Sequence, residues 1–464
     1  MTTIDWLIIF LSIIICYFIV VLIFHKKGIL EKYNISFYGP FLLLRTKKGL
    51  GFLKKIASKK RFWKAYGSFG IVFCLISGFI VLIFFIWNFI FLLGITPEQK
   101  AALPGPEFVL ALPGINPILP MEYFFYIILA FIVAIIVHEF SHGILAYAGD
   151  LKVKSMGLIY IIIPFGAFVE PDEKQLKNTK ISKRMRVFAV GPLSNFVAAF
   201  ICLLLISLIL FSSVQPGSGL TVFNVYENSP IDDAGIKKGA IITKINEFDL
   251  TNNESNEEGV LFYRSIINQT SVNDTITISY KYNNILYTKN INLTSEYSYY
   301  YKNYNITKNT NKNKTFDGVA SFILVRKNLD ILKNPFTNLS RFTYFLLIPV
   351  MGYFEGFNPI ADQFTDSYII KGPLSSLPKT VFWGIINALY WIFWLNLMVG
   401  LFNVLPMTPL DGGYLLNDLI RNAVKKLKKD ITDERTDIIV KNASLIISLT
   451  ILLLILFPLI IKYI

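Results

Sequence analysis

The chain has 464 residues, of which 54% are hydrophobic and 16% are charged, and its formal net charge is +14. Several apolar runs reach the roughly 20 residues that cross a bilayer, which excludes an ordinary soluble globular protein. The positive charge lies mainly in loops between these runs, where Lys and Arg set the orientation in the membrane. We therefore expect a polytopic membrane protein with the lipid bilayer as a partner and no nucleic-acid partner.

The first region, residues 1–121, is predicted to contain two transmembrane helices, over about 6–24 and about 68–93. The segment between them is rich in Lys and Arg, so we place it on the cytoplasmic side, where it can form a short interfacial helix. The loop 95–121 contains a single basic residue and several prolines, which places it outside the cell.

The second region, residues 122–212, begins with a predicted span over about 123–147 that contains the H-E-x-x-H pattern of His138, Glu139 and His142. Histidines four residues apart lie on one face of a helix, where two neutral imidazoles can bind one Zn²⁺ and the Glu can take a proton from a water held by the metal. Ionisable groups inside a membrane cost roughly 2.5–3.5 kcal/mol, so we interpret the pair as functional. The alternative is a chance match with two structural histidines.

Residues 157–169 are apolar and rich in β-branched side chains, but Pro164 and Gly166 interrupt them. Such a stretch is too short and too broken for a spanning helix, so we expect a re-entrant β-hairpin, with an interfacial loop as the alternative. The fourth span follows over about 186–211. Its Asn195 either packs as an amide between helices or acts near the metal.

Between residues 213 and 296 the composition becomes polar, with short β-like runs. The stretch 229–246 resembles the S-P-A-x-x-A-G-I-x-x-G-D-x-I-x-x-I-N pattern of PDZ domains in bacterial and archaeal proteases, with Ile231 in place of Ala and Ala240 in place of Asp. The resemblance implies an α+β domain outside the membrane. This domain either binds extended peptides by strand addition or only blocks access sterically.

A connector with an interfacial apolar segment, residues 297–376, leads to the last region, residues 377–464, with spans over about 380–402 and 443–461. This makes about six spans with both termini outside. The third and fifth spans then run in the same direction, so Asp411, just after the fifth, reaches the inner half of the membrane beside the histidines. A carboxylate there completes a three-ligand zinc site with a fourth position for water. The alternative is that Asp411 is an ordinary turn residue at a helix end.

The two motifs together resemble the site-2 protease family of intramembrane zinc metalloproteases, which combine H-E-x-x-H with an N-x-x-P-x-P-x-L-D-G motif. Residues 403–412 carry the second motif, with a one-residue difference in the placement of Pro406 and Pro409. The resemblance covers the third, fourth and fifth spans, the predicted hairpin and the PDZ-like stretch.

The resemblance implies a role for each candidate site residue. His138, His142 and Asp411 would bind the Zn²⁺ cofactor. Glu139 would be the catalytic residue that activates water and then passes the proton to the leaving amine. Asn403 would bind the substrate, either at its backbone or at the oxyanion. The partner would be a membrane-embedded protein substrate whose transmembrane helix unwinds before cleavage.

We therefore expect a mainly α fold, a polytopic membrane helix bundle with an inserted PDZ-like α+β domain and a membrane-associated β-hairpin. The expected location is the cell membrane, with the PDZ-like domain outside and the active site toward the cytoplasmic half. The expected function is an intramembrane zinc endopeptidase acting in regulated intramembrane proteolysis. One alternative is a zinc-binding or zinc-transport protein without peptidase activity, which would not need Glu139, and another is an inactive scaffold.

Overall fold

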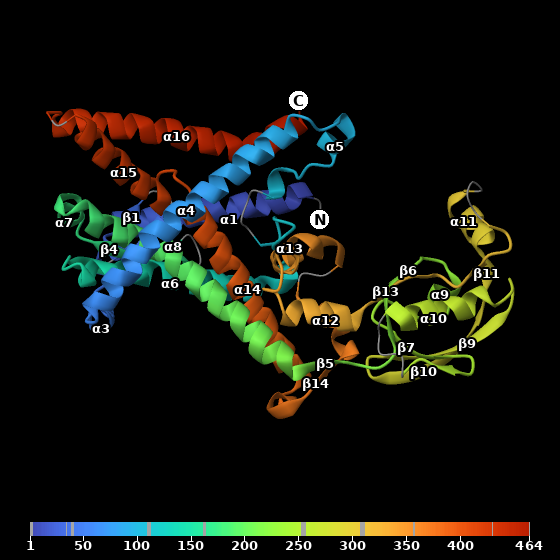
Figure 1. The fold of residues 1–464 in the computed structure, drawn as a ribbon. Coiled ribbons are helices and arrows are strands. Elements are labelled where there is room, and N and C mark those ends of the chain that lie inside the picture. Colours follow the sequence, from blue (N-terminus) through green and yellow to red (C-terminus); the bar gives the residue numbers. More distant parts are fainter. Residues whose placement is uncertain are drawn as a thin grey trace. The chain divides into compact units, whose positions relative to one another are not determined.

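The fold comes from a computed structural model, which describes residues 3–33, 35–38, 41–108, 113–160, 164–251, 257–306, 311–355, 358–428 and 430–463. The chain divides into two compact units (Figure 1). One consists of Met1–Ile201 together with Trp391–Ile464, and the other of Cys202–Tyr390. Each unit has buried apolar clusters of its own.

Within the described residues, five helices are long and apolar enough to cross a membrane. They are α4 (Lys60–Leu92), α6 (Phe124–Ala148), α8 (Ile181–Leu204) with its continuation through η3 (Leu205–Leu210) and η4 (Phe211–Ser213), α14 (Lys379–Asn403) and α16 (Asp433–Lys462). The remaining predicted span, over 6–24, falls on α1 (Thr3–Lys26), within which a shorter apolar helix, Ile15–Lys26, is described. The described part of the chain thus contains five such helices where we expected about six.

Helix α4 separates a lipid-exposed side from a packed side. Phe79 and Ile90 are 64% and 61% exposed. In a membrane, lipid tails would cover large apolar side chains such as these. Gly67, Gly70 and Gly78 are buried instead. Small residues allow neighbouring helices to approach closely, and α4 contacts α6 and α16.

The predicted hairpin forms part of a larger antiparallel sheet with the order β1-β2-β3-β4. Its strands are β1 (Ile35–Tyr38), β2 (Phe41–Thr46), β3 (Val153–Tyr160) and β4 (Pro164–Pro171). Strands β3 and β4 pair antiparallel, with Leu158 opposite Ala167, and residues 161–163, where the turn of the expected hairpin falls, lie outside the described residues.

The basic segment after the first helix contains strands as well as short helices. We expected a short interfacial helix there, and α2 (Ile29–Lys32) and α3 (Leu50–Ile56) lie in this segment. The strands were not expected, and β2 pairs with β3 from Leu42 opposite Tyr160 to Thr46 opposite Met156. The reason is that a two-stranded hairpin leaves the outer backbone groups of β3 unpaired, and the apolar run of β2 supplies their hydrogen-bond partners. No described strand pairs with the outer edge of β4, and β4 packs against α6.

The shorter elements of this unit connect the helices and the sheet. They are α2 (Ile29–Lys32), α3 (Leu50–Ile56), α5 (Pro97–Ala101), η1 (Pro106–Phe108), η2 (Met121–Tyr123), α7 (Glu173–Asn178) and α15 (Asp411–Leu427).

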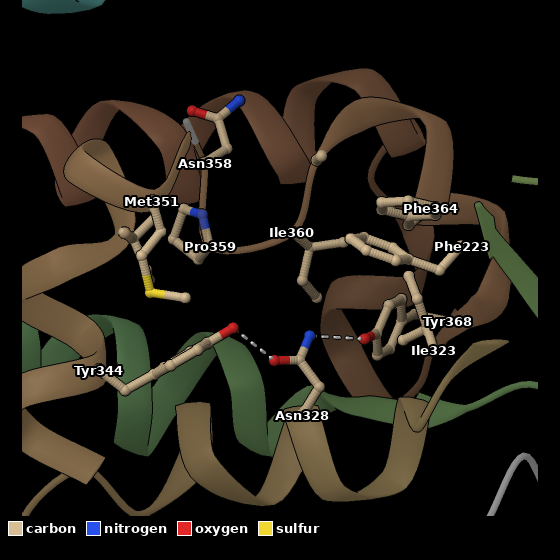
Figure 2. A pocket seen from close by; sticks show the side chains of 12 residues that line it. Phe223, Ile323, Asn328, Tyr344, Met351, Asn358, Pro359, Ile360, Phe364 and Tyr368 are labelled. Carbon is tan, nitrogen blue, oxygen red and sulfur yellow. Dashed lines mark hydrogen bonds between the residues drawn. The ribbon is translucent and has the colours of Figure 1, made fainter. Parts of the chain in front are cut away.

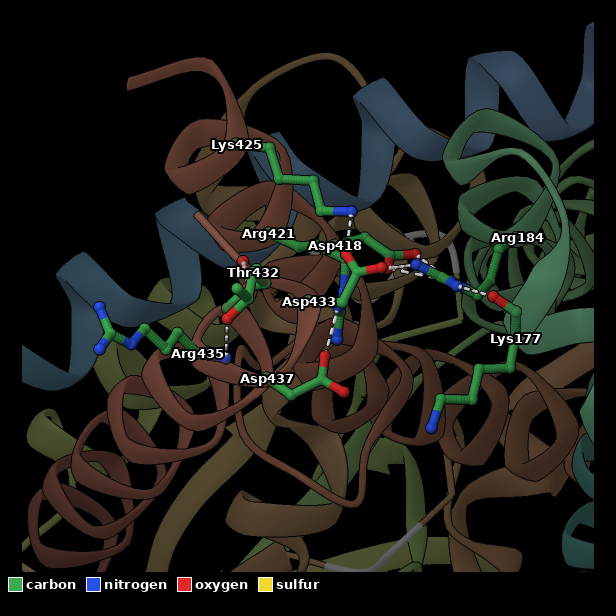
Figure 3. Close-up of polar contacts among 10 residues, drawn as sticks. Lys177, Arg184, Asp418, Arg421, Lys425, Thr432, Asp433, Arg435 and Asp437 are labelled. Atoms are coloured by element: carbon green, nitrogen blue, oxygen red, sulfur yellow. Dashed lines mark hydrogen bonds and ion pairs between the residues drawn. The ribbon is translucent and has the colours of Figure 1, made fainter. Parts of the chain in front are cut away.

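Ion pairs hold α15 to its neighbours (Figure 3). Arg184 of α8 donates from Nε to both carboxylate oxygens of Asp418, at 2.9 Å each, and Asp418 is only 4% exposed. Arg421 forms an ion pair with Asp437 of α16, and Lys425 forms one with Asp433 of the same helix. A buried charge pair with several hydrogen bonds holds one geometry, because losing either partner leaves an uncompensated charge. The Arg184–Asp418 pair therefore fixes α15, and with it the residue that begins this helix, against α8.

The second unit contains a sheet with the order β10-β9-β7-β6-β13, with β8 on β7. The elements are β6 (Leu220–Val225), α9 (Pro230–Asp233), β7 (Ile241–Ile245), β8 (Phe248–Asp249), α10 (Glu257–Asn268), β9 (Thr275–Tyr282), β10 (Ile285–Asn292) and β13 (Val319–Ile323). Alternating residues such as Ile276 and Ile278 of β9 and Ile242 of β7 form its buried core. Strand β13 comes from the segment that we expected to be a connector, and it pairs with β6.

The rest of the second unit consists of short elements. They are β5 (Val214–Pro216), β11 (Thr294–Ser295), α11 (Glu296–Tyr304), β12 (Thr315–Phe316), α12 (Val325–Lys333), α13 (Leu339–Glu355), η5 (Asp362–Ser367), β14 (Tyr368–Ile370) and η6 (Gly372–Ser376). Strand β14 pairs with β5, and β11 with β12.

Candidate metal centre

The structure brings together His138, His142 and Asp411, which come from two distant parts of the sequence. Asp411 Oδ2 lies 3.0 Å from His138 Nε2 and 3.3 Å from His142 Nε2. One ligand atom from each of the three residues lies within 4.8 Å of the others. All three residues are buried, with at most 9% of their surface exposed. The cluster therefore offers two imidazole nitrogens and a carboxylate oxygen around one point.

Local geometry explains how each ligand reaches this point. The histidines are four residues apart on α6, which places both on one face of the helix. Asp411 is the first residue of α15, and two glycines follow it. A Cβ on Gly412 would lie 2.3 Å from the carbonyl oxygen of Val404, so only glycine lets the helix begin this close to the preceding turn. Asp411 is therefore a residue at a helix start and not at a helix end.

The second nitrogen of each imidazole has a neighbour on α8. The Nδ1 of His142 lies 2.6 Å from the carbonyl oxygen of Val187. Because a carbonyl only accepts, this nitrogen carries the proton, and the lone pair of Nε2 points to the cluster. The Nδ1 of His138 lies 3.4 Å from the amide of fully buried Asn195, whose Oδ1 has no hydrogen-bond partner among the described residues.

The residues present fit a zinc ion on two observations. First, Asp411 Oδ2 makes no hydrogen bond within the described chain although two nitrogens face it. Second, a Cβ on Gly191 would lie 2.5 Å from His142 Nε2 and 2.8 Å from His138 Nε2, so the missing side chain keeps space beside the ligand atoms. Tetrahedral zinc at its usual bond lengths holds ligand atoms roughly 3.3–3.5 Å apart, close to the separations found here.

Glu139 lies next to the cluster on the same helix, and its carboxylate is held by the sheet. Its Oε2 accepts a hydrogen bond from the backbone N–H of Val169 on β4, at 3.0 Å. The hydrogen bond orients a half-buried carboxylate that is not among the three candidate ligands. Glu139 is thus placed between the candidate metal ligands and the edge strand β4.

Asn403 is placed differently from the other candidates. It is the last residue of α14, and its Nδ2 donates to the carbonyl oxygen of Val399 in the same helix, at 3.0 Å. Within the described residues, no hydrogen bond joins it to the three candidate ligands. Sequence reasoning did not single out Gly191 or the Val187 carbonyl. The Gly191-Pro192 pair inside a predicted span is the signal that could have found them, because glycine and proline are costly in a helix interior.

Comparisons with known proteins identify the family to which this arrangement belongs. The family model described as Peptidase family M50 matches residues 126–451, a stretch that includes both motifs and most of the chain. The chain belongs to peptidase family M50. The family corresponds to the site-2 proteases, so the resemblance noted in the sequence is confirmed.

Several relatives share large parts of the chain. An uncharacterized protein of Methanocaldococcus jannaschii is 28% identical over 84% of this chain and 80% of its own length. The zinc metalloprotease RasP of Shouchella clausii is 26% identical, and the regulator of sigma-W protease RasP of Bacillus subtilis is 24% identical, each over 53% of both chains. Among solved structures, the PDZ domain of an SdrC-like protein from Listeria monocytogenes matches with 20% identity, covering 23% of this chain and 88% of that domain, with a TM-score of 0.17.

The M50 membership confirms three expectations. The protein is a zinc metalloprotease, its cofactor is Zn²⁺, and it is an integral membrane protein. The chain spans about half the length of each RasP relative.

Proposed function

We propose that this M50 peptidase cleaves peptide bonds inside the membrane, within transmembrane segments of membrane-anchored proteins. The observation that carries the proposal is the convergence of His138, His142 and Asp411 beside Glu139, within a bundle of membrane-crossing helices. His138 and His142 would hold zinc through Nε2, and Asp411 through Oδ2. When bound, zinc supplies Lewis acidity, which polarises the scissile carbonyl and lowers the pKa of water.

Glu139 would carry the proton during the reaction. Its Oε2 is engaged by the Val169 N–H, so Oε1 is the oxygen that takes the proton from the attacking water. The same carboxyl then delivers the proton to the amine that leaves. Val187 and Asn195 would keep the two imidazoles oriented through their Nδ1 atoms. Asn403 would contact the substrate only after its side chain leaves the Val399 carbonyl.

The free edge of strand β4 offers a place where an unwound substrate segment would bind. A peptide bond in a helix is shielded by its own hydrogen bonds, so the substrate has to unwind before attack. Strand β4 ends its sheet in the described structure, and its Val169 is bonded to Glu139. An unwound segment that adds to this edge would run beside the catalytic carboxylate.

Replacement of Glu139 by Gln tests the proposed function. The variant should keep stoichiometric zinc and lose cleavage of a model transmembrane substrate, because the amide neither accepts the proton nor returns it. Glu122→Gln is the matched control, since Glu122 is exposed in η2 just before the same helix. A zinc-transport function instead predicts that Glu139→Gln keeps zinc flux into vesicles. Full cleavage by Glu139→Gln would overturn the proposal.

The location of the PDZ-like domain is part of the proposal. We place this domain outside the cell and the metal centre toward the cytoplasmic half, on the distribution of Lys and Arg between the spans. There the domain would admit only substrates that were first trimmed outside. A deletion of residues 215–323, which removes the sheet together with β13, should then allow cleavage of untrimmed substrates. Unchanged discrimination between trimmed and untrimmed substrates would contradict this role.

A further inference from the structure

A strongly basic surface lies at the start of α4, in a part of the chain that the catalytic proposal does not use. Residues 47–64 include eight Lys and Arg residues and no Asp or Glu. The basic residues are Lys47, Lys48, Lys54, Lys55, Lys59, Lys60, Arg61 and Lys64. Figure 1 shows α3 beside the end of α4 at which this helix begins. Because α4 is long and apolar enough to cross a membrane, the charge gathers where the chain enters the bilayer.

Most of this charge has no counter-charge within the protein. Lys60 forms an ion pair with Asp150, which lies just after α6. In the part of the chain that the structure describes, no ion pair involves Lys54, Lys55 or Lys59, and all three are exposed. Several unpaired cations on one surface repel each other, so a partner with negative charge would be attracted to them.

Large apolar side chains lie among these charges. Phe52 of α3 and Phe62 of α4 are 60% and 58% exposed. Phe62 begins a row of exposed side chains along α4 that continues with Phe69 and Ile76, so it marks the level at which lipid tails begin. Phe52 lies outside this span and shares one face of α3 with Lys55, three residues further on. An exposed aromatic ring beside unpaired lysines is typical of a segment that lies on an anionic membrane surface.

The opposite face of α3 packs against the catalytic helix. Leu53 is fully buried. A Cβ on Gly143 would lie 3.0 Å from Leu53 Cδ1 and 2.9 Å from Val169 Cγ1. Gly143 directly follows the candidate ligand His142. Leu53 therefore lies where α6 meets β4, the strand that holds Glu139.

Helix α3 is too short to hold this position by itself. It has seven residues, and isolated helices shorter than about 12–15 residues are marginal in water. The Nε1 of Trp63 donates to the carbonyl oxygen of Ile56 at 2.8 Å, which ties the end of α3 to the first turn of α4. A membrane surface bound to the exposed face of α3 would add a contact on the other side.

The pocket of the second unit does not provide a comparable site. Figure 2 shows Asn328 within it, held by hydrogen bonds with Tyr344 and Tyr368. None of the described residues that line this pocket carries a charge. A phosphate group would lose its hydration there without meeting an opposite charge. The basic surface of residues 47–64 is therefore the better match for an anionic ligand.

We propose that α3 and the first turn of α4 bind the headgroups of anionic phospholipids. Lys54, Lys55 and Arg61 would bind the phosphates, and the ring of Phe52 would insert at the level of the upper acyl chains. A soluble acidic protein would pair with the lysines but would leave the exposed ring in water. Lipid is the favoured partner because it covers both kinds of side chain at the end of a spanning helix.

Bound lipid would act on cleavage through one apolar cluster. The cluster contains Leu53 together with Val169 and Val187. The N–H of Val169 holds Glu139, and the carbonyl of Val187 accepts from His142. Lipid that keeps α3 in place would therefore keep both groups oriented. This effect rests on the proposed function, and it concerns kcat and not KM, because none of these contacts is made with the substrate.

The binding test uses the full-length protein with Glu139→Gln in bilayer discs of phosphatidylcholine. The probe is spin-labelled phosphatidylglycerol, spin-labelled phosphatidylcholine is the neutral reference, and electron paramagnetic resonance measures the fraction of each at the protein. We expect a preference for phosphatidylglycerol that falls in about 1 M salt, where the screening length is about 3 Å. Lys54→Gln combined with Lys55→Gln should lower the preference by up to about fivefold per lysine, which corresponds to about 1 kcal/mol each.

Two controls separate this site from its alternatives. Lys426→Gln combined with Lys428→Gln removes two exposed lysines at the end of α15 and should leave the preference unchanged. An equal loss in this control would assign the preference to the charge of the whole side and overturn the proposal. Displacement of the labelled phosphatidylglycerol by soluble polyglutamate would show a site for acidic protein segments and would overturn it too.

Cleavage of a model transmembrane substrate by the active enzyme tests the link to catalysis. The kcat should rise as phosphatidylglycerol replaces phosphatidylcholine, with KM unchanged. Leu53→Ala should keep the lipid preference and lose this dependence of kcat, whereas Leu53→Met, which conserves the volume, should keep both. Thermal unfolding checks that both variants are folded. A kcat of the parent enzyme that is independent of phosphatidylglycerol would overturn the link.

The two tests also separate this proposal from the proposed function. A preference for phosphatidylglycerol without cleavage of any substrate would refute the proposed function and leave the lipid site in place. Cleavage that is abolished by Glu139→Gln, together with equal association of both labelled lipids, would refute the lipid site and leave the proposed function in place.

Discussion

Gly191→Ala tests whether the space between α8 and the two histidines is needed for zinc. The added Cβ would lie 2.5 Å from His142 Nε2 and 2.7 Å from His138 Cε1, whereas ordinary contact begins at 3.4 Å. The imidazoles would have to move by about 0.9 and 0.7 Å, the difference between these distances. Zinc sites tolerate deviations of only about 0.2 Å in ligand distance. We therefore expect a large loss of zinc affinity.

The size of this loss can be bounded from related changes. Replacements around metal ligands typically reduce affinity about 10–100-fold, and a direct displacement of two ligands belongs at the upper end. A 100-fold loss corresponds to about 2.7 kcal/mol. The assay is a competition titration of the purified protein against a zinc chelator, with metal content measured in parallel and thermal unfolding as a check on folding.

Gly51→Ala is the matched control for this prediction. Gly51 lies in helix α3, and a Cβ there would meet nothing within 4 Å. This change should leave zinc affinity unaltered and either keep or slightly raise stability, because alanine favours helix. If Gly191→Ala lowered the unfolding temperature but bound zinc as tightly as the parent, α8 would have moved and our reasoning about this space would be wrong.

Three further predictions concern other parts of the chain. Asn195→Ala should lower zinc affinity about tenfold, because the Nδ1 of His138 loses its neighbour, and Asn195→Asp should restore most of it in the same chelator titration. Asp418→Asn should destabilise the protein by about 3–5 kcal/mol by leaving Arg184 unpaired, and a double replacement of both residues by Leu and Met should recover much of the loss in thermal unfolding. Burial raises the pKa of Asp317, so the folded state favours the protonated form, and its stabilising effect is present at acid pH and lost as pH rises through the raised pKa. Asp317→Asn should therefore flatten the decline in the stability of the PDZ-like domain with rising pH above about 4, measured by limited proteolysis, and an unchanged slope would contradict this assignment.

The PDZ-like domain illustrates how far local sequence patterns reach. The stretch 229–246 indicated a PDZ-like module, and β6 and β9 lie where the short β-like runs 220–225 and 275–280 suggested strands. The edge strand β13 was not predicted, because its pairing with β6 joins residues about a hundred positions apart. A short run such as Val319–Ile323 has no periodic signal long enough to distinguish a strand from a connector.

The sheet near Glu139 shows the same limit. The β-branched residues of 157–169, interrupted by Pro164 and Gly166, were the basis for predicting strands there, because strand preference and turn residues are local properties. Its extension by β1 and β2 depended on an unpaired edge in another part of the chain, which no pattern within the basic segment reveals.

By itself the sequence indicated which residues are candidates for the chemistry. The spacing of His138 and His142 in an apolar helix, and the Asp-Gly motif that begins at Asp411, follow from the order of residues alone. Only the tertiary structure decided that these groups share one point, that Gly191 leaves room beside them, and that Val169 holds Glu139. The physical reason is that helix periodicity acts over a few residues, whereas distances between helices arise from packing among segments far apart in the chain.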